Sequence, residues 1–189
     1  MAFIETIPEE QAQGETKRLY DRHLERQGYI PNYARVYSHR PEVMAAWGEL
    51  LRAVKRPMDE RRFELATLAA ARALGNAYCS LAHGTILCEK FFSAEQLTRI
   101  AEDFRTAGLP PADVAIMAFA ERMARDASSI TAEDVAGLRA HGLSEAEIFD
   151  VAAAAAARCF FAKMLDALGA QPDAIYQELE EGLRRRLAG

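Results

Sequence analysis

The stretch that decides the fold is residues 59–83, D-E-R-R-F-E-L-A-T-L-A-A-A-R-A-L-G-N-A-Y-C-S-L-A-H. Its apolar residues recur with helical period, and Asp59 stands before them in the position of a helix N-cap. Gly75 can end this first helix and Asn76 can cap a second one. If the chain reverses at Gly75, the two helices lie antiparallel. The stretch therefore predicts a helical hairpin.

The remainder of the chain continues the same pattern. Capped segments with helical period follow one another, and the alternation that is typical of strands is nearly absent. The expected helices cover residues 9–26, 41–54, 60–74, 93–108, 112–125, 131–141, 145–168 and 172–186, besides the one that Asn76 caps. We therefore expect an all-α fold.

Two alanine-rich stretches, residues 60–87 and 144–168, echo each other weakly. Both are capped and as long as two short helices, so the pattern fits an old internal duplication as well as two unrelated core hairpins. No proline-rich or glycine-rich linker divides the chain. We predict a single domain over residues 1–189, with an N-terminal helical extension of about residues 1–55.

Composition limits the function classes. The chain has 189 residues, is 50% hydrophobic and carries a formal net charge of −5, without a basic block. This balance disfavours nucleic acid and anionic membranes as partners. The most apolar run, residues 151–157, is too short to span a bilayer, and the first residues lack the pattern of a signal peptide. Three cysteines without a Cys-x-x-Cys pair indicate a reducing, cytoplasmic compartment.

The candidate chemistry centres on Cys79 and His83. They are four residues apart, which places them on one face of a helix. With Asn76 as the N-cap, Cys79 lies in the first turn, where the helix dipole lowers the pKa of a thiol. We therefore expect Cys79 to ionise more easily than Cys88 or Cys159 and to act as a nucleophile.

Glu64 can join this pair only through the hairpin. It precedes Cys79 by fifteen residues, and one continuous helix would hold the two about 22 Å apart. In an antiparallel hairpin, Glu64 reaches the level of His83. The expected relay runs Cys79–His83–Glu64, with or without a water, and Tyr78 is expected to hydrogen-bond or line the pocket.

The alternative interpretation is structural. Free cysteines are commonly buried and inert, and this is what we expect of Cys88 and Cys159. Arg158 and Lys163 interrupt the second alanine-rich stretch, and the sequence does not decide whether they face solvent, a partner subunit or the site. No metal or other cofactor is expected, because zinc needs clustered ligands.

The motif from Glu64 to His83 resembles the active-site signature of the alkylhydroperoxidase AhpD and carboxymuconolactone decarboxylase superfamily. That signature is a glutamate, a Cys-x-x-Cys twelve residues later, and a histidine four residues after the second cysteine. Glu64, Asn76, Cys79 and His83 fall on the four positions. Further stretches resemble the peroxidase-related branch, and they are residues 30–32, 38–42, 138–144 and 166–169.

The resemblance implies an all-α fold that assembles as a homo-oligomer, such as a dimer, trimer or hexamer. It implies Cys79 as the thiol that attacks peroxide, with His83 and Glu64 as a proton relay. The resolving cysteine of the family is replaced by Asn76. An oxidised Cys79 would then be reduced by an external thiol or approached by Cys159 through tertiary or subunit packing.

Three function hypotheses follow from the resemblance. The first is a thiol-dependent peroxidase that reduces small hydroperoxides. The second is a lyase or isomerase acting on a small carboxylated lactone, in which His83 and Glu64 do acid–base work. The third is a non-catalytic oligomeric stress-response protein that retains only the fold.

Overall fold

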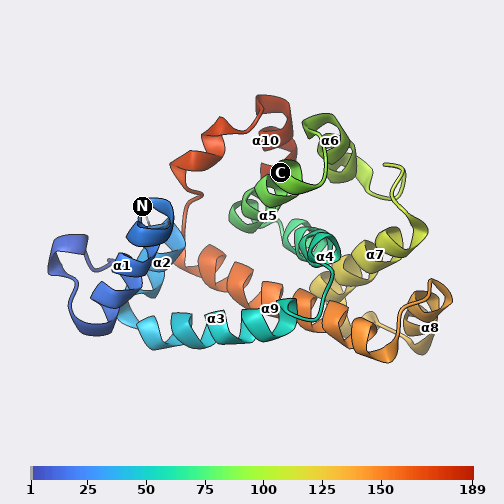
Figure 1. Cartoon of the computed structure of the whole chain (residues 1–189), viewed down its shortest axis with the longest axis horizontal. Helices are drawn as coiled ribbons and strands as arrows, with labels where there is room; N and C mark the ends of the chain where they lie inside the picture. Colours follow the sequence, from blue (N-terminus) through green and yellow to red (C-terminus); the bar gives the residue numbers. More distant parts are fainter. Residues whose placement is uncertain (1) are drawn as a thin grey trace.

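The protein is described by a computed structural model that covers residues 2–189, and every regular element in that range is a helix (Figure 1). The α-helices are α1 (Gly14–Gln27), α2 (Asn32–Val36), α3 (Pro41–Lys55), α4 (Glu60–Ala73), α5 (Ala77–Lys90), α6 (Ala94–Asp103), α7 (Pro111–Asp126), α8 (Ala132–Ala140), α9 (Glu145–Leu168) and α10 (Glu181–Ala188). The 3₁₀ helices are η1 (Glu9–Gln11), η2 (Tyr37–His39), η3 (Ala127–Ser129) and η4 (Ala174–Glu178). The predicted all-α fold is confirmed.

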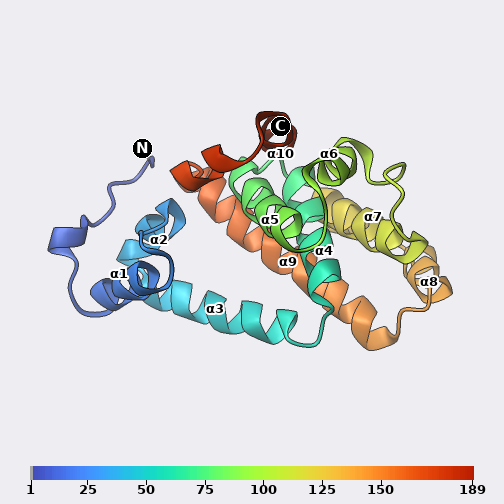
Figure 2. The ribbon, with the colours of Figure 1, turned by 45° about the horizontal axis from the view of Figure 1, so that its top comes forward.

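Helix α4 lies at the centre of the molecule. It packs against α5, α7 and α9, and every residue from Phe63 to Ala71 is buried. A helix that is buried on all sides needs small side chains where its neighbours approach closely, and alanine supplies them here. Figures 1 and 2 show α1–α3 at one end of the molecule and α6–α8 at the other, with α4, α5 and α9 between them.

The predicted hairpin is α4 and α5. Asp59 caps α4 by accepting a hydrogen bond from the Arg62 N–H, and Asn76 caps α5 by accepting one from the Cys79 N–H. Gly75 between the helices has φ +70°, a left-handed conformation that glycine adopts without strain. These local signals are strong enough to determine the turn from sequence.

The predicted first helix, residues 9–26, is wrong at its start. The chain forms the 3₁₀ turn η1, and α1 begins only at Gly14. Ala12 and Gln13 between them are extended, and this conformation carries the Ala12 side chain into the core.

The predicted C-terminal helix from residue 172 is also wrong, because η4 and α10 replace it. Asp173 could have capped such a helix, but its carboxylate instead accepts hydrogen bonds from the Asn32 N–H and the Tyr78 hydroxyl. The helix predicted over residues 93–108 ends earlier, at Asp103. The second alanine-rich stretch is the single helix α9, so it is not a second hairpin.

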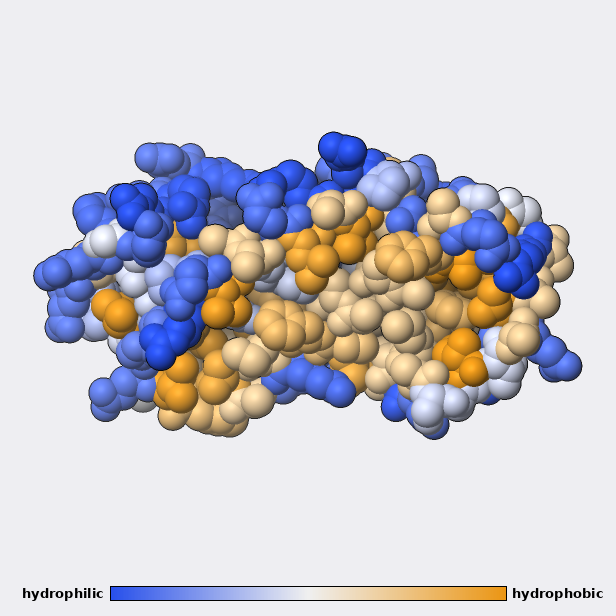
Figure 3. Space-filling view, turned by 90° about the horizontal axis from the view of Figure 1, so that it is seen from below, coloured by the Kyte–Doolittle hydropathy of each residue, from blue (hydrophilic) through white to orange (hydrophobic). Residues whose placement is uncertain are grey.

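One face of the molecule exposes apolar side chains from α3 and α9. Leu50 is 51% exposed, Phe149 71% and Phe160 45%, and Figure 3 shows apolar residues gathered in a band across the molecule seen from below. Contiguous exposed apolar surface of this kind marks association sites. We therefore predict that a second copy of the chain covers this face.

Light scattering at micromolar concentration is expected to give a mass above that of one chain, and Phe149→Asp is expected to lower it. Ile175→Asp is the matched control, because Ile175 is also exposed but lies outside α3 and α9. A wild-type protein that is monomeric would contradict the prediction.

Candidate active site

The hairpin brings Glu64 and His83 into direct contact. Glu64 Oε2 lies 2.5 Å from His83 Nδ1, and Glu64 Oε1 accepts a hydrogen bond of 2.8 Å from Lys55 Nζ. The Glu64 carboxylate is buried, so each of its oxygens exchanges water for a nitrogen donor. The sequence predicted that the hairpin would bring Glu64 to the level of His83, and in the structure the two side chains are in contact.

The contacts set the protonation of this pair. Burial alone would raise the pKa of Glu64, but the hydrogen bonds and charges of His83 and Lys55 lower it to about 2. Burial and the nearby Arg158 charge lower the pKa of His83, against the pull of Glu64. Neutral His83 therefore donates its Nδ1 proton to the carboxylate, which leaves Nε2 as an unprotonated base.

Cys79 lies in the first turn of α5, and its side chain is 1% exposed. Its sulfur accepts a hydrogen bond from Arg158 Nη1 at 3.4 Å. In the described part of the chain, no hydrogen bond links this sulfur to His83. The direct thiol–imidazole contact of the expected relay is thus absent, and any proton transfer between the two passes through a water or a bound substrate.

The expected lowering of the Cys79 pKa is also absent. Burial raises the pKa of the thiol, while the charge and hydrogen bond of Arg158 oppose the increase. The pKa values of Cys88 and Cys159 are raised as well, in both cases mainly by burial. The group that favours the Cys79 thiolate is therefore the Arg158 guanidinium rather than the imidazole.

Arg158 is the residue that sequence reasoning left open. It is 4% exposed, and its guanidinium carbon lies 6.0 Å from the Trp47 ring centre and 5.6 Å from that of Phe161. Its Nε has no hydrogen-bond partner within residues 2–189. The available signal was a single charge in an alanine-rich run between Asp150 and Lys163, since a lone arginine on a buried helix face needs an anion.

The two supporting residues have structural contacts of their own. The Asn76 side chain accepts the Cys79 N–H at 2.7 Å and donates to Ala162 O at 3.2 Å and to Asp166 Oδ1 at 2.6 Å. Tyr78 follows the cap but directs its hydroxyl to Asp173. Tyr78 therefore helps to line the site and anchors the C-terminal segment there.

The other two cysteines belong to a different part of the core. Cys79 packs in a cluster with Tyr37, Trp47 and Phe161, at the end of the molecule that holds α1–α3. Cys88 and Cys159 pack against the separate cluster around α4, α6 and α7. All three cysteines are free thiols. The alternative that Cys159 resolves an oxidised Cys79 within one chain therefore has no support in the packing.

A cavity of about 670 Å³ opens onto this site. Cys79, His83 and Arg158 line it together with an aromatic wall of Trp47 and Phe161, whose rings stack with centres 5.0 Å apart. The cavity therefore has room for a small organic molecule beside Cys79 and His83, and the Cys79 side chain itself is buried at its wall.

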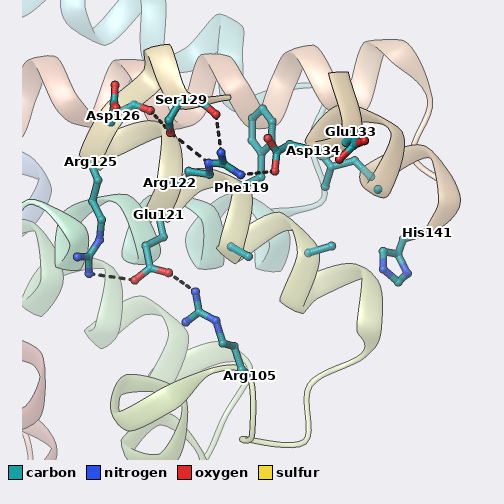
Figure 4. A pocket seen from close by; sticks show the side chains of 14 residues that line it. Arg105, Phe119, Glu121, Arg122, Arg125, Asp126, Ser129, Glu133, Asp134 and His141 are labelled. Carbon is teal, nitrogen blue, oxygen red and sulfur yellow. Dashed lines mark hydrogen bonds and ion pairs between the residues drawn. The ribbon is translucent and has the colours of Figure 1, made fainter. Parts of the chain in front are cut away.

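A second hollow, of about 820 Å³, lies between α7 and α8 (Figure 4). Its arginines are paired with carboxylates: Arg122 pairs with Asp134 at 2.6 Å, and Arg125 pairs with Glu121 at 3.1 Å. Glu121 also binds Arg105. Because these three arginines are paired and no thiol is present among the lining residues, the candidate active site is the cavity at Cys79.

Comparison with known proteins gives a family match for part of the chain and a fold match for nearly all of it. Residues 41–122, which include the hairpin and its turn, match the carboxymuconolactone decarboxylase family. The fold matches an AhpD-core peroxidase-related protein from Ralstonia eutropha JMP134 with a TM-score of 0.82 and 21% identity, over 93% of this chain and 94% of that one. Residues 41–122 are thus similar to the carboxymuconolactone decarboxylase family, and the whole chain has the fold of AhpD-core peroxidase-related proteins.

Other solved structures share the AhpD-like fold. A peroxidase-related protein from Silicibacter sp. TM1040 gives a TM-score of 0.78 at 20% identity, over 93% and 91% of the two chains. The debrominase Bmp8 gives 0.76 at 17% identity, over 96% of each. A cysteine-to-alanine variant of Bmp8 has been solved with 2,3,4-tribromopyrrole. A sequence search of curated proteins gave no match.

The buried Glu64 carboxylate in this hairpin should make the stability of the fold depend on pH in the acid range. The pKa of Glu64 falls from 4.5 to about 2 on folding, so its ionisation stabilises the fold above pH 4.5 and this contribution is lost as the pH falls towards 2. This decrease of about 2.5 pKa units corresponds to about 3–4 kcal/mol at about 1.4 kcal/mol per unit.

Glu64→Gln is expected to lower stability at neutral pH and to flatten its fall between pH 4.5 and pH 2, as followed by urea unfolding. Glu25→Gln, at an exposed position on α1, is the control and is expected to keep the wild-type slope. Equal slopes in the two variants would contradict the assigned ionisation.

Proposed function

We propose that the protein is a thiol-dependent peroxidase that reduces small organic hydroperoxides through Cys79. The proposal rests on one arrangement above all: an otherwise inaccessible thiol meets a buried guanidinium on the wall of an organic-sized cavity. The guanidinium favours the thiolate, which is the nucleophilic form of cysteine. The peroxidase-related structures with the same fold agree with it.

The reaction begins with transfer of the Cys79 proton to His83 Nε2, through a water or the bound substrate. The thiolate attacks the terminal oxygen of the hydroperoxide, and the O–O bond breaks as the S–O bond forms. The alkoxide leaves as an alcohol after it takes the proton from His83. Cys79 is then a sulfenic acid. Glu64 holds the imidazole in place and stabilises its charged form between the two proton transfers.

Recovery of the thiol needs an external thiol reductant. Asn76 stands where the superfamily signature has a resolving cysteine, and Cys159 packs in another cluster. One external thiol condenses with the sulfenic acid to a mixed disulfide and releases water. A second external thiol displaces Cys79 and leaves as the oxidised disulfide. The reductant supplies both electrons.

A lyase acting on a carboxylated lactone is the second candidate. One observation favours it: neutral His83, fixed by Glu64, lies in a cavity lined with cations. In that reaction His83 is the base and Cys79 is incidental.

Hydroperoxide consumption with dithiothreitol as reductant separates the two candidates. The wild type is expected to turn over, Cys79→Ser to lose at least about 100-fold in rate, and Cys159→Ser to keep its rate. Full hydroperoxide turnover by Cys79→Ser contradicts the peroxidase. Turnover of a carboxylated lactone that survives Cys79→Ser and is lost in His83→Gln favours the lyase.

A further inference from the structure

The charge of the Cys79 cavity is opposite to that of the chain. The protein carries a formal net charge of −5, yet none of the residues lining this cavity is a carboxylate. Its permanent cations are Arg26, Arg52, Lys55, Arg56 and Arg158. A cleft lined by one sign of charge concentrates ligands of the other sign.

Three of these cations have no acidic partner in the described chain. Lys55 is paired with Glu64 and Arg52 with an acid on its own helix. Arg26 and Arg56 are exposed and form no ion pair within residues 2–189. In the same range, the Arg158 side chain donates a hydrogen bond only to the Cys79 sulfur and has no carboxylate partner. The positive charge is therefore available to a ligand and is not neutralised by the fold.

The floor of the cavity carries an unsatisfied donor as well. Arg158 is more than nine-tenths buried, and its Nε–H lacks a partner in the described structure. A buried donor without an acceptor costs free energy, and an oxygen atom of a bound ligand removes that cost. The floor thus suits an oxygen-bearing group next to the sulfur.

The walls between floor and mouth are apolar. Trp47 and Phe161 form the stacked aromatic side, and Met44 and Leu51 from the α3 region also line the cavity. An aromatic ring or a branched alkyl group fits this surface. A hydrated inorganic anion, in contrast, would gain nothing from it.

From this distribution we propose that the substrate of this site is an organic anion: an apolar body with a carboxylate at the end remote from the reacting group. The carboxylate lies at the mouth, near Arg26 and Arg56, where guanidinium groups can bind it through paired hydrogen bonds. The inference rests on the proposed function for the reacting group, a hydroperoxide whose leaving oxygen accepts the Arg158 Nε–H. Peroxide reduction then proceeds as described above.

The turnover test compares cumene hydroperoxide with its para-carboxylate at low salt. We expect kcat/KM to be at least about tenfold higher for the carboxylate, with the ratio falling as salt screens the cations. Arg26→Gln and Arg56→Gln should each lower kcat/KM for the carboxylate about three- to tenfold and so reduce its ratio to that of the neutral hydroperoxide. Arg22→Gln is the control, because Arg22 lies on the same helix as Arg26 but does not line the cavity.

A binding test separates this inference from the peroxidase proposal. The chain has one tryptophan, Trp47, so its fluorescence reports occupancy of the cavity. The unreactive analogues 4-isopropylbenzoate and isopropylbenzene are titrated into the wild type. Tighter binding of the benzoate than of isopropylbenzene, with the difference reduced in Arg56→Gln, supports the inference. A lack of hydroperoxide turnover would overturn the peroxidase proposal and leave this binding result intact. Equal binding of the two analogues, or no binding of either, overturns the inference.

Discussion

Arg158→Met is expected to slow the reaction of Cys79 with hydroperoxide by about tenfold to a thousandfold at neutral pH. An opposite charge within about 4–6 Å lowers a thiol pKa by about one to three units, and Arg158 Nη1 lies 3.4 Å from the sulfur. In the variant, burial still raises the Cys79 pKa, but the opposing effect of the Arg158 charge is lost. When the second-order rate constant of Cys79 oxidation is plotted against pH, the midpoint of the curve should move to higher pH by about one to three units.

Two further measurements separate this effect from damage to the fold. Arg158→Lys retains the charge and should recover part of the rate with a smaller shift of the midpoint. The melting temperature of Arg158→Met should be equal to or above that of the wild type, because methionine removes a buried, partly unsatisfied charge. An unchanged pH midpoint in Arg158→Met would show that the guanidinium does not control the thiolate.

Asn76→Cys is expected to convert the site into a dithiol that closes to a disulfide with Cys79. The two positions are three residues apart at the start of α5, a spacing at which first-turn dithiols can form a disulfide. After a peroxide titration, intact-mass analysis should show the variant losing two hydrogen atoms. The wild type should instead gain oxygen or form a mixed disulfide with added thiol.

The same substitution is expected to destabilise the protein by about 2–4 kcal/mol. Loss of an N-cap costs about 1 kcal/mol, and the Asn76 amide also donates hydrogen bonds to Ala162 O and Asp166, each worth about 1 kcal/mol. Asn76→Ser is the matched control, since it keeps a capping oxygen but cannot form a disulfide. A disulfide between Cys79 and Cys159 in the wild type would show that the resolving step is internal.

The parts of the site that sequence reasoning predicted are those set by local signals. Asn76 as a cap, Gly75 as a left-handed turn and the helical period on either side are enough to specify the hairpin. Once the hairpin is specified, simple helix geometry brings Glu64 to His83. Each of these steps depends on residues fewer than twenty positions apart in the chain.

The parts that were missed depend on distant packing. Arg158 reaches Cys79 across 79 residues, and Asp173 binds Tyr78 across 95. No local sequence pattern indicates which face of α9 packs against α5. The sequence therefore did not predict that Arg158 contacts the Cys79 thiol, or that burial raises the pKa of this thiol. The diversion of Asp173 to Tyr78 also explains why residues 172–180 do not form the expected helix.

The proposed function requires Cys79, despite its burial, to be the thiol that reacts with hydroperoxide. The most direct test is a sub-stoichiometric pulse of cumene hydroperoxide in the presence of a sulfenic-acid trap, followed by peptide mass spectrometry. We expect the trap adduct on Cys79, with the more exposed Cys88 and Cys159 unmodified. An adduct on Cys88 or Cys159 with Cys79 still a free thiol, or no adduct on any cysteine, would contradict it.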